Sequence, residues 1–175
     1  MEKKLQHQFD ALEKQRKQLL QSVASLSDEQ LNKIPAADKW SINQIIFHVI
    51  LAEELSYKSI KAKVISSKDF QKASVMSFVR STLLKLVLRS PRKFKAPLIV
   101  SKMPEKSNLS ELVTKWEEVR SLIKELLESL PPHLLDKYIY KHPVAGKMDI
   151  YCGLDFLSEH LRRHQIQIEK MIELG

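Results

Sequence analysis

Three histidines have the side-chain type and the spacing of metal ligands. His160 and His164 are four residues apart in a predicted helix, so their side chains share one face, one turn apart. His48 lies within the apolar stripe of another predicted helix. If these two helices pack side by side, three neutral imidazoles converge and leave a coordination position open, as in catalytic divalent-metal sites. We therefore predict a metal site formed by His48, His160 and His164; the alternative is two surface histidines and one core histidine.

Such a site allows two kinds of chemistry. A divalent ion held by three imidazoles can lower the pKa of a water molecule to roughly 7 for hydrolysis, or can bind and deprotonate a substrate thiol. Hydrolysis usually needs a carboxylate base, but Glu159 lies about 100° around the helix from His160. The missing base favours the thiol chemistry, and we assign no catalytic residue. Zinc and nickel are the expected ions, although iron and manganese also accept imidazole.

Two more residues are candidates for supporting the ligands. Gln167 shares the face of His160 and His164, where it could orient a ligand or contact substrate; an interhelical hydrogen bond is the alternative. Glu53 lies on the apolar stripe of the His48 helix, which is unexpected for a carboxylate unless it is paired. It could hold a ligand imidazole, or it could be a helix-edge carboxylate that reaches solvent or a lysine. His142 is predicted to be a loop residue near the end of the bundle.

Periodic apolar residues and capping patterns predict five long helices. The last is the helix of His160 and His164, and Asp149 is its predicted N-cap. Capping boxes are predicted at Ser27, Ser41 and Asn108, because each has Gln or Glu three residues on. Ser27 opens only a short turn. The five long helices cover about residues 3–24, 41–65, 74–89, 108–130 and 149–174.

The composition favours helices over sheet. Only three glycines occur, which argues against a many-stranded sheet. Residues 91–107 hold three prolines and are predicted to be an extended connection, and residues 140–148 are predicted to be a loop. We expect one domain over residues 1–175, an all-α four-helix bundle with an additional basic helix.

The middle third of the chain carries the basic excess. The net charge is +8, and thirteen Lys and Arg against two acids give +11 between Lys58 and Lys106. Residues 75–95 are amphipathic and cationic, a pattern that can lie on an anionic membrane or contact phosphates. The favoured prediction is a helix that packs on the bundle and has a charged outer face. No module for specific nucleic-acid recognition is present.

The cysteine content and the hydropathy pattern indicate the compartment. The single cysteine, Cys152, cannot form an internal disulfide, which fits a reducing cytoplasm. The N-terminal residues lack the apolar core of a signal peptide, and no apolar run is long enough to span a membrane. We expect a cytoplasmic protein, with peripheral membrane contact as the less favoured alternative.

Three segments carry a family resemblance. They are Trp40-Ser-Ile-Asn-Gln-Ile-Ile-Phe-His, His142-Pro-Val-Ala-Gly-Lys-Met and His160-Leu-Arg-Arg-His-Gln-Ile-Gln. In this order they resemble the DinB-like family of four-helix bundles, over nearly the whole chain and most weakly at residues 66–107. The resemblance implies a divalent metal held by His48, His160 and His164, with Gln167 near the site.

The DinB-like family also suggests classes of function. Its members include stress-inducible proteins, metal-dependent hydrolases and bacillithiol- or mycothiol-type thiol transferases. The resemblance therefore implies a small-molecule substrate, such as a low-molecular-weight thiol, and a homodimer, which is common in the family. The alternative is a non-enzymatic stress-related or membrane-surface binding protein whose metal site is structural or vestigial.

Overall fold

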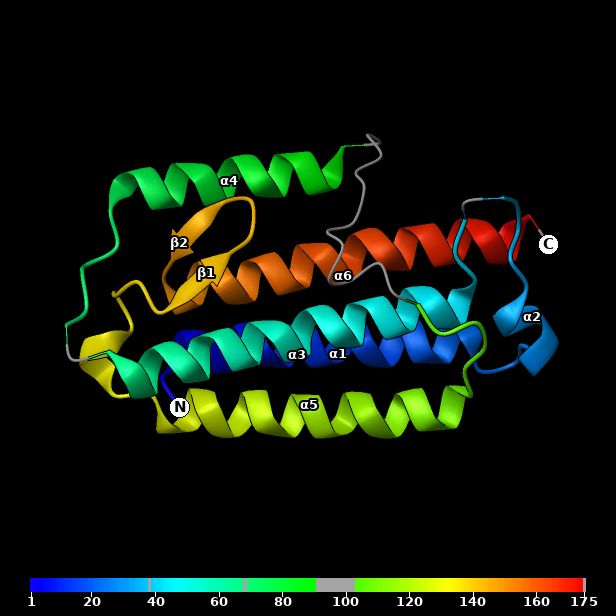
Figure 1. Ribbon diagram of the computed structural model, residues 1–175, viewed down its shortest axis with the longest axis horizontal. Coiled ribbons are helices and arrows are strands. Elements are labelled where there is room, and N and C mark those ends of the chain that lie inside the picture. Colours follow the sequence, from blue (N-terminus) through cyan, green and yellow to red (C-terminus); the bar gives the residue numbers. More distant parts are fainter. Residues whose placement is uncertain (38, 68, 91–102, 175) are drawn as a thin grey trace.

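Four long helices lie side by side as a bundle, and a fifth lies outside it (Figure 1). The computed structural model describes residues 1–37, 39–67, 69–90 and 103–174. The bundle helices are α1 (Lys3–Val23), α3 (Ile42–Ser66), α5 (Leu109–Ser129) and α6 (Ile150–Glu173). The outer helix is α4 (Val75–Arg89), which packs on α6. The predicted four-helix bundle with an additional basic helix is confirmed.

A complete capping box fixes the start of α3, the helix of His48. The Ser41 hydroxyl accepts the N–H of Gln44 at 3.2 Å, and the Gln44 side-chain oxygen accepts the N–H of Ser41 at 3.0 Å. The Gln44 side chain also donates to the carbonyl of Pro104 at 3.0 Å, which ties this end of α3 to the segment before α5. A second predicted box, at Ser27, opens the short helix α2 (Asp28–Asn32).

The caps of α5 and α6 agree with the sequence to different degrees. Asp149 caps α6 as predicted, because its carboxylate accepts the N–H of Cys152 at 2.8 Å. Asn108 caps α5, but the predicted box with Glu111 is wrong. The Asn108 side chain accepts the N–H of Ser110 instead, at 2.8 Å. A short Asn side chain can reach the second N–H of a helix as well as the third, so the helix still begins at the expected place.

The core is built from the predicted apolar stripes. Large side chains with less than 2% of their surface exposed include Leu5, Leu12, Leu19, Ile45, Ile46, Ile50, Trp116 and Leu127. Each such burial contributes about 1.5–3 kcal/mol before the entropic cost of folding. On α3 the stripe is buried from Ile42 to Ile50, whereas Leu55 is only partly buried. The α3 helix contacts α2, α5, α6 and the first strand, which explains its broad buried face.

A buried charged cluster links three bundle helices. Arg120 of α5 donates to both carboxylate oxygens of Glu53 on α3, each at 2.7 Å. Trp116 donates its indole N–H to the same carboxylate at 2.9 Å. Arg120 also reaches the carboxylate of Glu13 on α1 at 3.1 Å. Glu53 and Arg120 are 1% and 3% exposed, so each depends on the other to compensate a buried charge.

A β-hairpin replaces the loop predicted at residues 140–148. Strand β1 (Tyr140–His142) pairs antiparallel with β2 (Gly146–Met148), with His142 opposite Gly146. The hairpin turn needs a residue with positive φ, and Gly146 supplies it at +77°. The Tyr140 hydroxyl lies 3.0 Å from that of Ser56, which fastens the hairpin to α3. Two strands of three residues were too short to give a period-two pattern in the sequence.

The orientation predicted for α4 is wrong. Its buried side chains are Ser77 and Ser81, whereas the apolar residues expected to pack on the bundle are exposed. Those residues are Val75, Phe78, Val79, Leu83, Leu86 and Val87. Among the residues that the structure describes, no helix is both long and apolar enough to cross a membrane. The extended connection predicted for residues 91–107 falls largely on residues 91–102, which lie outside the described part of the chain.

Candidate metal centre

Packing of α3 against α6 brings the three predicted histidines together. His48 lies in the second turn of α3, and His160 and His164 lie near the middle of α6. The Nε2 atom of His160 is 3.2 Å from Nε2 of His48 and 3.2 Å from Nε2 of His164. The ligand atoms of the three side chains all lie within 4.8 Å of one another. Within the described ranges, this is the single cluster of three or more potential metal ligands.

The two separations, His48 to His160 and His160 to His164, have the length expected for nitrogens that share a cation. Two nitrogens bound tetrahedrally to zinc, each at 2.0–2.1 Å, lie about 3.3 Å apart. The Nδ1 of His164 faces the side-chain oxygen of Gln167 at 3.1 Å. Because that oxygen can only accept, Nδ1 carries the proton, and Nε2 of a neutral His164 presents a lone pair. The Nε2 atom of His160 carries either one proton or one lone pair, so it cannot hydrogen-bond to both neighbouring nitrogens at once. A cation, in contrast, can accept a lone pair from each of the three nitrogens.

Burial keeps the two α6 imidazoles in the form that binds metal. Desolvation, with a smaller effect of His48, lowers the pKa of His164 to about 3. Desolvation, followed by the effects of His164 and His48, also lowers the pKa of His160 well below its usual value of 6.5. Metal ligation requires the neutral imidazole, so at neutral pH no proton has to be displaced from either ring.

Aromatic rings surround the histidines. The Trp40 ring lies 4.9 Å from the ring of His48, measured between centroids. Phe156 lies 5.5 Å from His160, with the two ring planes at 28°. Phe156 was not identified from the sequence, although its four-residue spacing before His160 places it on the same face as His160 and His164. These rings restrict the imidazoles and contribute to their desolvation.

His142 lies next to this aromatic layer and outside the nitrogen cluster. Its ring is 4.3 Å from the ring of Phe156, and it is 7% exposed. Its Nδ1 accepts the backbone N–H groups of Val144 at 3.2 Å and Ala145 at 3.0 Å. Burial lowers the pKa of His142 to about 4. The residue predicted to lie in a loop is therefore the end of a strand, where its neutral ring closes the hairpin turn.

Comparison with known proteins identifies the family. A family model described as the DinB superfamily matches residues 11–168. The chain belongs to the DinB superfamily. The uncharacterized protein YuaE of Bacillus subtilis (strain 168) is 24% identical over 151 residues, which cover 86% of this chain and 88% of YuaE.

The fold of this DinB-superfamily protein also resembles a solved structure. YfiT from Bacillus subtilis, described as "a probable metal-dependent hydrolase with an unusual four-helix bundle topology", matches with a TM-score of 0.62. The match covers 98% of this chain and 87% of YfiT at 16% sequence identity. At that identity the likeness supports the bundle fold, and the argument for a function rests on the site.

The two residues predicted to support the ligands lie in different surroundings. Gln167 contacts His164 directly, as the hydrogen bond to Nδ1 indicates. The carboxylate of Glu53 instead binds Arg120 and Trp116, and no contact between it and the three imidazoles is found among the described residues. The alternatives of solvent or a lysine, considered from the sequence, were wrong because the partner is a buried arginine.

The acid next to His160 points away from the cluster. Glu159 pairs with Arg89 of α4 and lies 3.9 Å from Arg162. These cations, with the Arg89 hydrogen bond first, hold the pKa of the Glu159 carboxyl below its usual range. Glu159 is thus a charged contact between α6 and α4, as its position around the helix suggested.

Proposed function

We propose that this DinB-superfamily protein binds one divalent metal ion through the Nε2 atoms of His48, His160 and His164. The single observation that carries the proposal is the convergence of these atoms, with two separations of 3.2 Å. Zinc and nickel are the proposed ions, because both accept an all-imidazole ligand set. When bound, such an ion supplies Lewis acidity that lowers the pKa of a coordinated water or thiol.

Neighbouring residues would prepare the three ligands. Gln167 accepts the Nδ1 proton of His164 and so fixes the tautomer whose Nε2 is free to bind. Trp40 and Phe156 cover the rings of His48 and His160 and limit the directions in which they can turn. A ligand set held in this way needs little rearrangement when a cation arrives.

We propose that the protein is a metal-dependent enzyme acting on a small-molecule substrate. Hydrolysis is supported by the likeness to YfiT, described as a probable metal-dependent hydrolase. Transfer of a low-molecular-weight thiol is supported by the ligand cluster itself, which contains imidazoles and no carboxylate among the described residues. Substrate screens for both reactions should follow the metal measurement.

The first experiment measures the metal content of protein purified without a histidine tag. We expect about one equivalent of a transition metal in the wild type and loss of that metal in His48→Ala and His160→Ala. His133→Ala is the matched control, because His133 is exposed and remote from the cluster in sequence. Absence of metal from all four proteins, even after incubation with zinc or nickel, would show that the histidines are structural.

Oligomeric state, domain organisation and location complete the proposal. We propose that residues 1–175 form one domain. We also propose that two copies of the chain form a homodimer and that the protein is located in the cytoplasm. The single buried Cys152 supports the location, because it is suited to a reducing compartment. Sedimentation velocity over a range of concentrations tests the dimer, and a strict monomer would reject it. Cell fractionation tests the location.

A further inference from the structure

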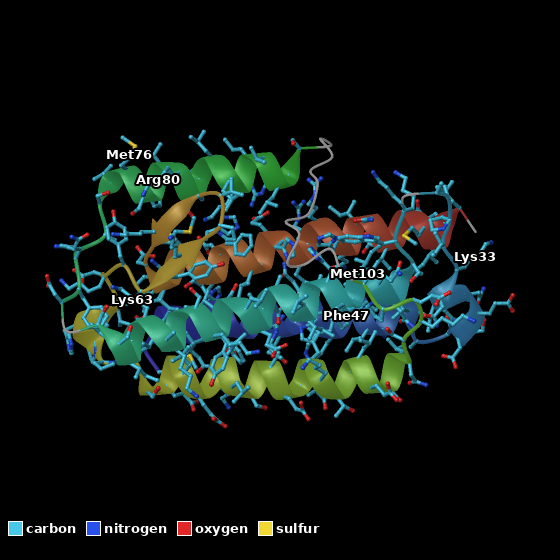
Figure 2. The ribbon with its side chains drawn as sticks, in the orientation of Figure 1. Lys33, Phe47, Lys63, Met76, Arg80 and Met103 are labelled. Atoms are coloured by element: carbon cyan, nitrogen blue, oxygen red, sulfur yellow. The ribbon has the colours of Figure 1, made fainter. Side chains whose placement is uncertain are left out.

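The α4 helix directs an apolar face toward solvent. Residues Val75, Val79, Leu83 and Val87 form one row at four-residue spacing, and Phe78 and Leu86 belong to the adjacent row. We call these six residues the outer face of α4. Their exposed fractions range from 39% for Val87 to 81% for Val75. The neighbouring Met76 projects away from the bundle in Figure 2 and is 60% exposed. Apolar exposure this continuous marks an interaction surface.

Contacts between α4 and α6 keep the outer face turned outward. Lys85 pairs with Asp155 of α6, and Arg89 pairs with Glu159 of α6. Arg163 of α6 also donates to two carbonyls at the C-terminal end of α4, at 2.8 and 2.9 Å. Rotating α4 to bury its apolar residues would break these contacts and expose its two buried serines. The helix is therefore attached to the bundle by these polar groups together with Leu84 and Leu88, which are partly buried and pack against the core.

Basic residues lie along both borders of the outer face. By the helical period, Arg80 lies on one border, and Lys85 and Arg89 lie on the other, where they are paired with acidic residues of α6. Arg80 is exposed and makes no ion pair within the described residues. No acidic residue occurs between Phe70 and Pro104. Arg80 therefore places a positive charge beside the apolar face that no carboxylate of the described residues compensates.

The β1–β2 hairpin extends this surface beyond the helix. Val144, in the hairpin turn, is 81% exposed. Arg80, Val144 and Lys147 line one shallow, open depression between α4 and the hairpin. Lys147 and its cross-strand partner Lys141 are both exposed. An apolar tip flanked by cations therefore continues the pattern of the outer face.

We propose that the outer face of α4 and the hairpin turn dock on the surface of an anionic lipid bilayer. A convex apolar face fits a deformable planar interface, while the exposed cations Arg80, Lys141 and Lys147 reach the anionic headgroups. A helix of 15 residues is about 22 Å long, so it suits a position within the interface rather than across the bilayer. A second copy of this chain fits poorly, because a two-fold contact would set this surface, with its cations Arg80, Lys141 and Lys147, against itself.

The experiment measures sedimentation of the full chain with vesicles of phosphatidylcholine alone or mixed with phosphatidylserine. We expect binding to the mixed vesicles only, weakened by added salt. The double variant Leu83→Glu/Leu86→Glu should lower the partition coefficient at least ~10-fold, because two buried apolar contacts become charges. The control Ile34→Glu/Leu122→Glu introduces the same two charges at residues 50% and 38% exposed, in the loop after α2 and on α5, and should bind like the wild type.

Two further variants examine the charged border and the inserted helix. Arg80→Gln and Lys147→Gln should each weaken binding on the order of fivefold. Phe78→Trp should give fluorescence that shifts to shorter wavelength with mixed vesicles and stays unchanged with phosphatidylcholine. Circular dichroism and metal content should be normal in all these variants, which separates this proposal from that of the metal centre.

Three results would overturn the proposal. The first is failure to bind mixed vesicles at low salt. The second is equal binding by Leu83→Glu/Leu86→Glu and its control. The third is concentration-dependent self-association, or capture of an acidic protein, that this double variant abolishes while vesicle binding is absent. That third result would assign the outer face to a protein partner.

Discussion

The α3–α6 contact and the outer face of α4 are both unusual for a globular protein, in opposite ways. The first buries polar side chains, and the second exposes apolar ones. Around the candidate metal centre, imidazoles are withdrawn from water and covered by Trp40 and Phe156. On α4, six apolar side chains remain in water. Buried polar groups and exposed apolar groups are the informative exceptions in a globular fold. The bundle thus supplies rigid surroundings for the three imidazoles, whereas α4 contributes little to the core.

The largest effect on stability should appear when the buried charged cluster of the bundle, formed by Arg120, Glu53 and Trp116, is broken. Arg120→Met leaves the carboxylate of Glu53 buried without its cation, so the free energy of unfolding should fall by about 3–5 kcal/mol. Urea denaturation measures this change. Lys124→Met, which removes an exposed side chain 4.0 Å from Glu128 on the same helix, is the matched control. We expect it to change the free energy by less than ~0.5 kcal/mol.

The Arg120 prediction also distinguishes a charge effect from a packing effect. Glu53→Leu added to Arg120→Met removes the stranded carboxylate and should restore part of the lost stability. Restoration should be incomplete, because the indole N–H of Trp116 then loses its acceptor. If the double variant were no more stable than Arg120→Met, the loss would come from packing and the charge argument would fail.

Truncating one leucine in each region compares them directly. Leu161 of α6 is fully buried, and Leu86 of α4 is 59% exposed. Leu161→Ala should lower the free energy of unfolding by about 2–5 kcal/mol through lost contacts and the cavity left behind. Leu86→Ala should change it by less than ~0.5 kcal/mol. A comparable loss in both variants would mean that α4 buries its apolar face in the folded protein.

The sequence predicted the parts of the molecule whose signals are local. The caps at Ser41 and Asp149 fix where the two ligand-bearing helices begin. The four-residue spacing of His160 and His164 then fixes their shared face. The hypothesis that His48 lies beside them required the two helices to pack against each other, and α3 does contact α6.

The failures occurred where tertiary contacts decide between two possible faces. The sequence of an amphipathic helix does not determine which of its faces packs on the rest of the protein. In α4 that face is the one with Ser77 and Ser81. The partner of Glu53 could not be identified either, because Arg120 lies 67 residues away in a separate helix. The hairpin was missed for another reason, since its strands are only three residues long.

A smaller effect is expected at the residue that supports a proposed ligand. Gln167→Ala removes the acceptor for the Nδ1 proton of His164, so metal affinity should fall about 10–100-fold. Competition with a chromogenic chelator measures this affinity. Gln167→Glu keeps an acceptor and should retain most of it. Gln165→Ala is the matched control, because Gln165 donates to Glu169 on the same helix. An equal loss in the control would indicate a general effect on α6.

The smallest expected effect is on the pH dependence of stability in the metal-free protein. The pKa of His142 is about 4 in the folded state, against 6.5 ordinarily. Between these values the unfolded chain binds more protons, so the contribution of His142 is complete above about pH 6.5 and is lost as the pH falls toward 4. The lowered pKa values of His160 and His164 act in the same direction.

A substitution separates the contribution of His142 from those of the other two. The side-chain oxygen of His142→Asn can still accept the N–H groups of Val144 and Ala145, but it does not titrate. Urea denaturation should therefore show a stability loss between about pH 7 and about pH 5 that is smaller than in the wild type by about 2 kcal/mol. His133→Asn, at an exposed histidine, should leave the loss unchanged. An equal loss in His142→Asn and the wild type would mean that the ring of His142 becomes protonated without unfolding, and that the hairpin end of the bundle is open to water.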